Sequence, residues 1–176
     1  KETKATTLDL GNCGLTRVPV EVKELVWLEK IKFAVWAGER CDNPNNLISL
    51  ENIEGLINLR SIDVAVMREL SSLTQLSSLI HLQEINCEYT QVSNLSPLSS
   101  LTNLQKINCS DTQVSDLSPL SSLTNLQEIY CSYTQVSDLS PLSNLTQLSI
   151  LHFVRTQIND LAPIANLANL QEINCS

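Results

Sequence analysis

Aromatic residues are scarce in this sequence. It contains two Phe, two Trp and three Tyr, which make up 4% of the chain, whereas 43% of its residues are hydrophobic. A globular core of this size usually contains more aromatic side chains, because each of them buries a large area. Most of the apolar residues here are Leu and Ile. We therefore expect a core of many equivalent aliphatic positions, which is typical of a repetitive architecture.

Basic residues are scarce in the second part of the chain. After Arg68, only Lys106 and Arg155 oppose nine acidic residues, and the formal net charge of the whole chain is −8. A protein that binds nucleic acid needs a basic patch for the phosphates, and anionic membrane surfaces attract the same kind of patch. We therefore expect neither nucleic acid nor a membrane among the partners.

Long hydrophobic runs are also missing from the sequence. No run reaches the roughly 18 apolar residues that a membrane-spanning helix needs, and the sequence has no secretory signal and no initiating Met. We interpret 1–176 as a piece of a longer chain. Its last repeat stops just after a strand, so we expect this uncapped C-terminal edge to fray or to support self-association.

The main feature of the sequence is a 22-residue repeat. Equivalent leucines recur every 22 residues, at Leu82, Leu104, Leu126, Leu148 and Leu170. Four similar copies fill 82–169 and a partial copy follows. Upstream the same phase persists at Leu28 and Leu59, a first copy begins at Leu8, and an inserted loop lies at 34–46. The sequence thus predicts eight stacked units, the last of them incomplete, in one domain over 1–176.

Each unit has three predicted segments. Alternation at 129–131 is typical of a short strand, Thr134 follows at a corner, and 138–142 predicts a short 3₁₀ or α turn. Ser140 is the predicted N-cap, with Pro141 at the first helical position. Ala162 replaces the serine in a later unit, where we expect the cap to be lost.

The repeat pattern LxxLxLxxTxVxxLxxL resembles the leucine-rich-repeat family, in the 22-residue bacterial class of the internalins. The resemblance implies an α/β fold: a right-handed solenoid with a parallel sheet on its concave face and short turns on its convex face. The family usually has Asn where this chain has Thr90, Thr112, Thr134 and Thr156, so we expect only part of the family's Asn ladder. Residues 5–19 also resemble the first repeat of Roco proteins, which carry such repeats beside a GTPase.

The six cysteines are predicted to be structural, with one exception. Four occupy the inward second position of a strand, where we expect buried thiols: Cys87, Cys109, Cys131 and Cys175. Cys13 sits at a turn, and Cys41, in the inserted loop, is the best candidate for a reactive thiol. No C-x₂-C pair indicates a metal site. Unpaired buried thiols favour a reducing compartment, so we expect a cytoplasmic protein.

Catalytic groups do not converge in the sequence. The chain has two histidines, His81 and His152, and no phosphate-binding G-x-x-x-x-G-K-[ST] loop. We therefore expect no enzyme, no cofactor and no metal. The prediction is a module that recognises a protein partner on its concave face. The alternative is a regulatory repeat domain of a larger enzyme, such as a Roco GTPase.

The predicted binding residues gather in one neighbouring pair of units. Ser149–Arg155 replaces polar residues with apolar and basic ones, and the tyrosines of the preceding unit lie beside it in register. Interface hot spots favour Tyr and Arg, because both combine contact area with a polar group. Trp36 of the inserted loop is either a further contact or a cover for the core. The candidate set is Tyr130, Tyr133, Ile150, His152, Val154, Arg155 and Trp36.

Overall fold

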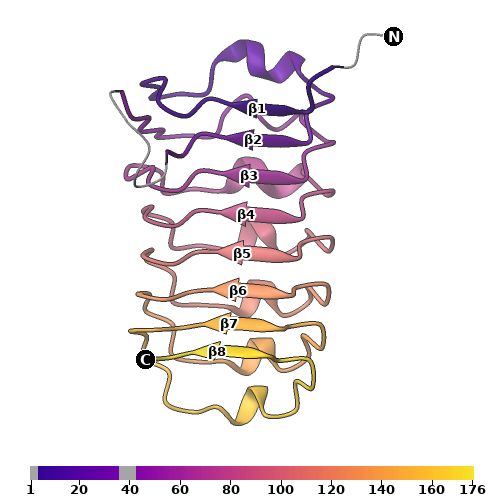
Figure 1. Cartoon of the computed structure of the whole chain (residues 1–176), viewed down its shortest axis with the longest axis vertical. Coiled ribbons are helices and arrows are strands. Elements are labelled where there is room, and N and C mark those ends of the chain that lie inside the picture. Colours follow the sequence, from indigo (N-terminus) through magenta and orange to yellow (C-terminus); the bar gives the residue numbers. More distant parts are fainter. Residues whose placement is uncertain (1–3, 36–42) are drawn as a thin grey trace.

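The structure, a computed structural model, describes residues 4–35 and 43–176. In these two ranges the chain winds into a single stack of coils with one open parallel sheet (Figure 1). The eight strands of the described residues follow the chain order from β1 to β8. Their bounds are Thr7–Asp9 (β1), Lys30–Lys32 (β2), Ser61–Asp63 (β3), Glu84–Asn86 (β4), Lys106–Asn108 (β5), Glu128–Tyr130 (β6), Ile150–His152 (β7) and Glu172–Asn174 (β8).

The register of the sheet confirms the predicted phase of the repeat. Ile129 pairs with Ile107 on one side and with Leu151 on the other. The same column continues across the inserted loop, where Ile31 pairs with Ile62. This column is the inward position of each strand, and its members from Ile31 to Leu151 are at most 2% exposed. Residues 22 or more apart in sequence thus form one continuous aliphatic core, because each unit covers the apolar side of the next.

The back of the coil consists of 3₁₀ turns (Figure 1). They are Val20–Glu24 (η1), Thr74–Ser78 (η2), Ser96–Leu98 (η3), Ser118–Leu120 (η4), Ser140–Leu142 (η5) and Ala162–Ile164 (η6). No α-helix occurs in the described residues. A unit of 22 residues leaves only a few positions for its back segment, and the tighter 3₁₀ turn uses fewer of them. None of the helices in the described part is long and apolar enough to cross a membrane.

The predicted capping of these turns is wrong. Ser140 is the first residue of η5 and makes no capping hydrogen bond with its side chain. The cap comes two residues earlier, where Asp138 Oδ1 accepts a 2.7 Å hydrogen bond from the Ser140 backbone N–H. Hydrogen bonds from the side chain and the backbone N–H of Ser140 lower the pKa of Asp138. Asp160 caps the Ala162 turn in the same way, at 2.8 Å, so the loss of the serine does not remove the cap.

The threonines at the corner make local hydrogen bonds, as expected. Thr112 Oγ1 donates to the Cys109 carbonyl at 2.6 Å, and Thr134 Oγ1 donates to the Cys131 carbonyl at 2.6 Å. Both bonds stay within one unit. Only part of the family's ladder is therefore kept in these repeats.

A buried asparagine near the N-terminal end makes the fuller network. Asn45, 5% exposed, donates to the Leu10 carbonyl at 2.7 Å and to the Phe33 carbonyl at 2.9 Å. Its Oδ1 accepts from the Leu15 N–H at 2.7 Å. Asn45 thus joins three segments of the first units, and the described end of the inserted loop is structural.

Replacing Asn45 with Ala is expected to lower the free energy of unfolding by about 2–4 kcal/mol, because three backbone groups lose their partners. Thr112→Val is the matched control: it removes one hydroxyl without changing the shape of the side chain, and it should cost about 1 kcal/mol. Urea unfolding followed by circular dichroism measures both values. Equal losses in the two variants would contradict the bridging role of Asn45.

The cysteine column is confirmed at three of its four predicted positions. Cys87, Cys109 and Cys131 are fully buried, but Cys175 is exposed. The prediction for Cys175 is wrong because no further coil packs against β8 within residues 43–176. Cys13 is exposed. Cys41 and Trp36 lie outside the described residues, as does most of the inserted loop.

Candidate functional site

The outward side chains of β3 to β8 form a continuous surface, which we call the front face. Its members are Ser61, Asp63, Glu84, Asn86, Lys106, Asn108, Glu128, Tyr130, Ile150, His152, Glu172 and Asn174. The strands hold these side chains in register, because each position pairs with its equivalent in the next unit. The front face is therefore a rigid array with rows one strand spacing apart, about 4.8 Å.

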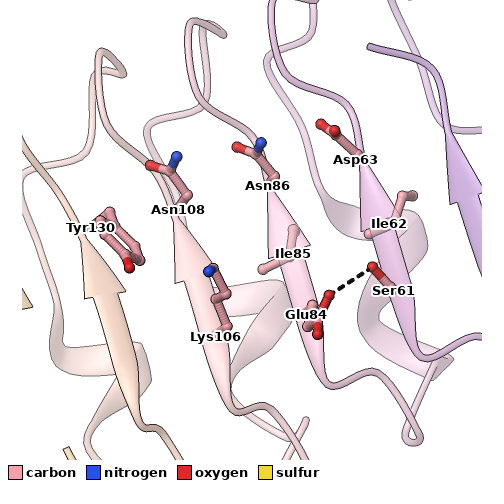
Figure 2. Close-up of a pocket in the computed structure, with 9 residues that line it drawn as sticks. All are labelled: Ser61, Ile62, Asp63, Glu84, Ile85, Asn86, Lys106, Asn108 and Tyr130. Atoms are coloured by element: carbon pink, nitrogen blue, oxygen red, sulfur yellow. Dashed lines mark hydrogen bonds between the residues drawn. The ribbon is translucent and has the colours of Figure 1, made fainter. Parts of the chain in front are cut away.

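A trough of about 340 Å³ crosses the front face from β3 to β6. Figure 2 shows Ser61 and Glu84 at one side, joined by a 3.1 Å hydrogen bond, and Tyr130 at the opposite side. Asp63, Asn86 and Asn108 are the last residues of β3, β4 and β5. Lys106 lies between Glu84 and Tyr130 (Figure 2). These positions were predicted to face outward, but the trough itself was not predicted.

Lys106, Glu128 and Tyr130 hold one another in place beside the trough. Lys106 Nζ lies 2.6 Å from Glu128 Oε2 and 5.2 Å from the centroid of the Tyr130 ring. The Tyr130 hydroxyl donates to Glu128 Oε2 at 2.9 Å. Partial burial opposes the ionisation of Glu128, but the hydrogen bonds from Lys106 and Tyr130 lower its pKa on balance. The hydrogen bond to Glu128 raises the pKa of Lys106.

His152 extends this row toward the C-terminal units. Its ring lies 4.9 Å from the Tyr130 ring, centroid to centroid, in an edge-on arrangement at 79°. Its Nε2 is 2.7 Å from Glu172 Oε1. The predicted neighbourhood of Tyr130 and His152 is thereby confirmed. Side chains from β5 to β8 thus form a connected polar and aromatic row.

The other predicted site residues fall into two places. Ile150 and Val154 are half-buried in the unit of His152. Tyr133 and Arg155 lie at the corner that follows their strands, where both have a φ of 55° and are exposed. The Tyr133 N–H donates to the Val154 carbonyl at 2.7 Å, which places Tyr133 one unit from Arg155. Trp36, the remaining candidate, lies in the undescribed segment.

Sequence reasoning missed two residues at this corner. Tyr89 and Asp111 occupy the position of Tyr133 in the two preceding units and share its left-handed conformation, with φ of 55° and 52°. The repeat phase was a sufficient signal for both.

The side chains of the site suit recognition by hydrogen bonds, charge and aromatic contact. Lys106 of the front face is paired with the Glu128 carboxylate, and His152 Nε2 lies 2.7 Å from Glu172 Oε1. The remaining charge of this surface is acidic. Within the two described ranges, no group of three or more His, Cys, Asp or Glu side chains could hold a metal ion.

Comparisons with known proteins agree with the repeat and the fold. Residues 80–122, 102–144 and 124–166 each match the family model described as Leucine Rich repeats (2 copies). Internalin C2 from Listeria monocytogenes is 29% identical, with a TM-score of 0.80 over 97% of this chain and 80% of that chain. No curated protein is significantly similar in sequence.

Two further solved structures share the fold at lower identity. The internalin InlF from Listeria monocytogenes is 23% identical, with a TM-score of 0.70 over 91% of this chain and 51% of that chain. A leucine-rich-repeat protein from Leptospira interrogans is 20% identical, with a TM-score of 0.61 over 92% of this chain and 52% of that chain. This chain therefore spans about half the length of each of these two proteins. Its repeats and its fold place the chain in the leucine-rich-repeat family, where it is similar to the bacterial internalins.

Proposed function

We propose that this chain is a recognition module that binds a protein partner through its front face. The observation that carries the proposal is the connected row from Lys106 to His152, in which each polar side chain is held by a neighbour. Side chains that are already ordered lose less entropy when a partner binds. Tyr130 is also an aromatic residue of the kind that anchors interfaces.

The contact region extends from the trough to the unit of His152. Tyr130 belongs to both, since it lines the trough and touches the His152 ring. Ile150 and Val154 add half-buried apolar surface, and Tyr133 and Arg155 border the region at the corner. An apolar and aromatic centre with a polar border is typical of an interaction site.

The charge of the surface favours a basic partner. After Arg68 the chain has nine acidic residues and two basic ones, and Lys106 is already paired with Glu128. Complementary charge accelerates association and makes it sensitive to salt. We propose on the same ground that nucleic acid and anionic membranes are not partners. The reducing, cytoplasmic location suggested by the buried thiols stays a proposal.

Three other roles have weaker support. A regulatory domain of a Roco GTPase is not favoured, because the similar structures reported above are internalins and a leptospiral repeat protein. Self-association through β8 has one observation in its support, since Ile173 of that strand is 47% exposed. A catalytic role has no observation in its favour.

The double variant Tyr130→Ala with His152→Ala is expected to weaken partner binding at least about tenfold, because hot-spot residues each contribute that much or more. Calorimetry with a purified partner, first captured by the wild-type chain from a bacterial extract, measures the affinity. Thr102→Ala with Thr124→Ala is the control, because both threonines are exposed and lie outside the front face. The proposal fails if the front-face variant binds as tightly as the control.

A further inference from the structure

One corner position has a left-handed backbone in five consecutive units. Its residues, which we call the left-handed row, are Val66, Tyr89, Asp111, Tyr133 and Arg155, with φ between 52° and 66°. Each of the first four donates its backbone N–H to a carbonyl of the next unit, as Tyr89 does to Ser110 at 3.1 Å and Asp111 does to Ser132 at 2.9 Å. These bonds fix the row on the rest of the solenoid, so its side chains project from a rigid backbone.

The residue types in this row are unfavourable for its backbone. A left-handed conformation is easy for Gly and tolerable for Asn and Asp, but it is strained for other residues. The first unit has Asn12 at the equivalent position, with φ of 61°. Tyr89 and Tyr133 lack the short polar side chain that lets Asn adopt this left-handed conformation. Strained residues are concentrated at functional sites, but Val66 shares this backbone, so the strain has to be weighed together with the side chains.

Packing does not explain the two tyrosines either. Tyr89 is 49% exposed and Tyr133 is 54% exposed. An aromatic ring placed in the core would repay strain by burying a large area, but these rings leave about half of their surface in water. Their side chains are therefore better explained by contact with something outside the chain.

Asp111 lies between the two tyrosines, one unit from each. The two rings belong to units two strand spacings apart, about 9.5 Å, with a carboxylate between them. Tyr89 and Asp111 line one hollow, and the negative charge of Asp111 raises the pKa of the Tyr89 hydroxyl. Aromatic faces attract cations, and a carboxylate pairs with them. This combination matches an ammonium or a guanidinium group.

The surroundings reinforce the preference for a cation. Glu88 precedes Tyr89 and is half-buried, and its pKa is raised by burial and by the charges of Asp111 and Asp63. Arg68 lines the same hollow as Tyr89 and Asp111. Among the described residues, however, no ion pair joins Arg68 to Asp111, although their side chains share this hollow.

We propose that Tyr89, Asp111 and Tyr133 form a clamp for one arginine or lysine side chain of a basic segment of the protein partner. This inference rests on the proposed function and specifies the chemistry of the partner. The clamp borders the front face, because each of its residues follows a front-face strand by three residues. A partner that lies over β4 to β7 can therefore reach it while it contacts Tyr130.

The test uses a fluorescein-labelled peptide with arginines spaced by Gly and Ser, and a matched peptide with uncharged citrulline in place of each arginine. Fluorescence anisotropy with the full chain gives the two affinities. Wild type is expected to prefer the arginine peptide. Asp111→Asn, and Tyr89→Asn with Tyr133→Asn, should each weaken its binding about five- to tenfold. Asn is compatible with the left-handed backbone, so both variants should fold.

Val66→Asn is the matched control. It relieves the same backbone strain one unit before the clamp and should leave the peptide affinity unchanged. The Tyr→Asn and Val66→Asn variants should also raise Tm by a few degrees, roughly 2–4 °C for each relieved position. Higher stability with weaker binding is the signature of residues kept for function, and a merely structural role would not produce it.

Three results would overturn the clamp. One is equal binding of the arginine and citrulline peptides by wild type, including no binding of either. Another is unchanged affinity in the clamp variants. The third is loss of binding in Glu84→Gln alone, which would place the cation in the trough. None of these results would contradict the proposed function. That function is tested separately, by the affinity of the Tyr130→Ala with His152→Ala variant for a protein partner.

Discussion

Replacing Leu126 with Ala is expected to lower the free energy of unfolding by about 2–5 kcal/mol, the usual range for a buried leucine. Leu126 is 0% exposed, and so are Leu104 and Leu148 in the units on either side. In a repeat array each unit is stabilised mainly by its two neighbours. A cavity in the middle of the stack therefore weakens two interfaces at once, and urea unfolding followed by circular dichroism measures the loss.

Two controls separate burial from position in this prediction. Gln127 is exposed, so Gln127→Ala should change the free energy of unfolding by less than about 0.5 kcal/mol. Leu170 is the equivalent leucine of the last unit and is only half-buried, so Leu170→Ala should cost less than Leu126→Ala. Similar losses at Leu126 and Gln127 would mean that the inward and outward positions are misassigned.

Alkaline pH is expected to destabilise the fold through its buried thiols. Burial raises the pKa of Cys87 and of Cys131 from 9.0 to about 12, and it raises the pKa of Cys109 well above its usual value. The unfolded chain then loses these protons at a lower pH than the folded chain. The stabilisation is fully present below pH 9 and is lost as the pH rises from there toward 12.

The expected size of this effect is large. Between about pH 8 and pH 10, Cys87 and Cys131 should each remove about 1.4 kcal/mol from the free energy of unfolding, and Cys109 adds a loss in the same direction. Cys87→Ala with Cys131→Ala should lower the stability at neutral pH, because it leaves small cavities, and should flatten the alkaline decline. Lysines and tyrosines titrate in both proteins, so the difference between the two curves isolates the thiols.

Thiol labelling provides an independent check on the same burial. In the native chain at neutral pH, a thiol reagent should modify the exposed Cys13 and Cys175 and leave Cys87, Cys109 and Cys131 unmodified. All of them should react after denaturation. Rapid native labelling of Cys109 would contradict the burial, and an equally steep alkaline decline in the double variant would contradict the thiol origin of the effect.

Periodicity determined most of the fold from sequence alone. The recurrence of leucines such as Leu126 predicted which side of each strand is inward, and the pairing of Ile129 with Ile107 and Leu151 confirms it. The prediction succeeded because one unit cannot bury its apolar side unless the next unit covers it in the same register. The same phase placed Tyr130 beside His152, which is the part of the candidate site that sequence could predict.

Other features depended on what each residue meets in three dimensions. Ser140 is a residue type favoured at the N-cap, but it is the first residue of η5, and its own backbone N–H donates to Asp138 Oδ1. Cys175 has the position of a core thiol, but it is exposed, because none of the described residues covers it. The role of Asn45 arises from the segments that the inserted loop brings together. The repeat pattern gives the position of each residue within a unit, and it does not give the distances between the groups that bond or cover one another.

The sequence by itself determined the architecture, the register and the acidic character of the surface, since all three follow from residue type and period. Only the tertiary structure decided how the surface is organised. It turned Lys106 toward Glu128 and Tyr130, it formed the trough from four strands, and it set Tyr89, Asp111 and Tyr133 on a strained left-handed backbone. The physical reason is that side-chain direction and backbone strain depend on stacking, whereas the period of the core depends only on which positions are apolar.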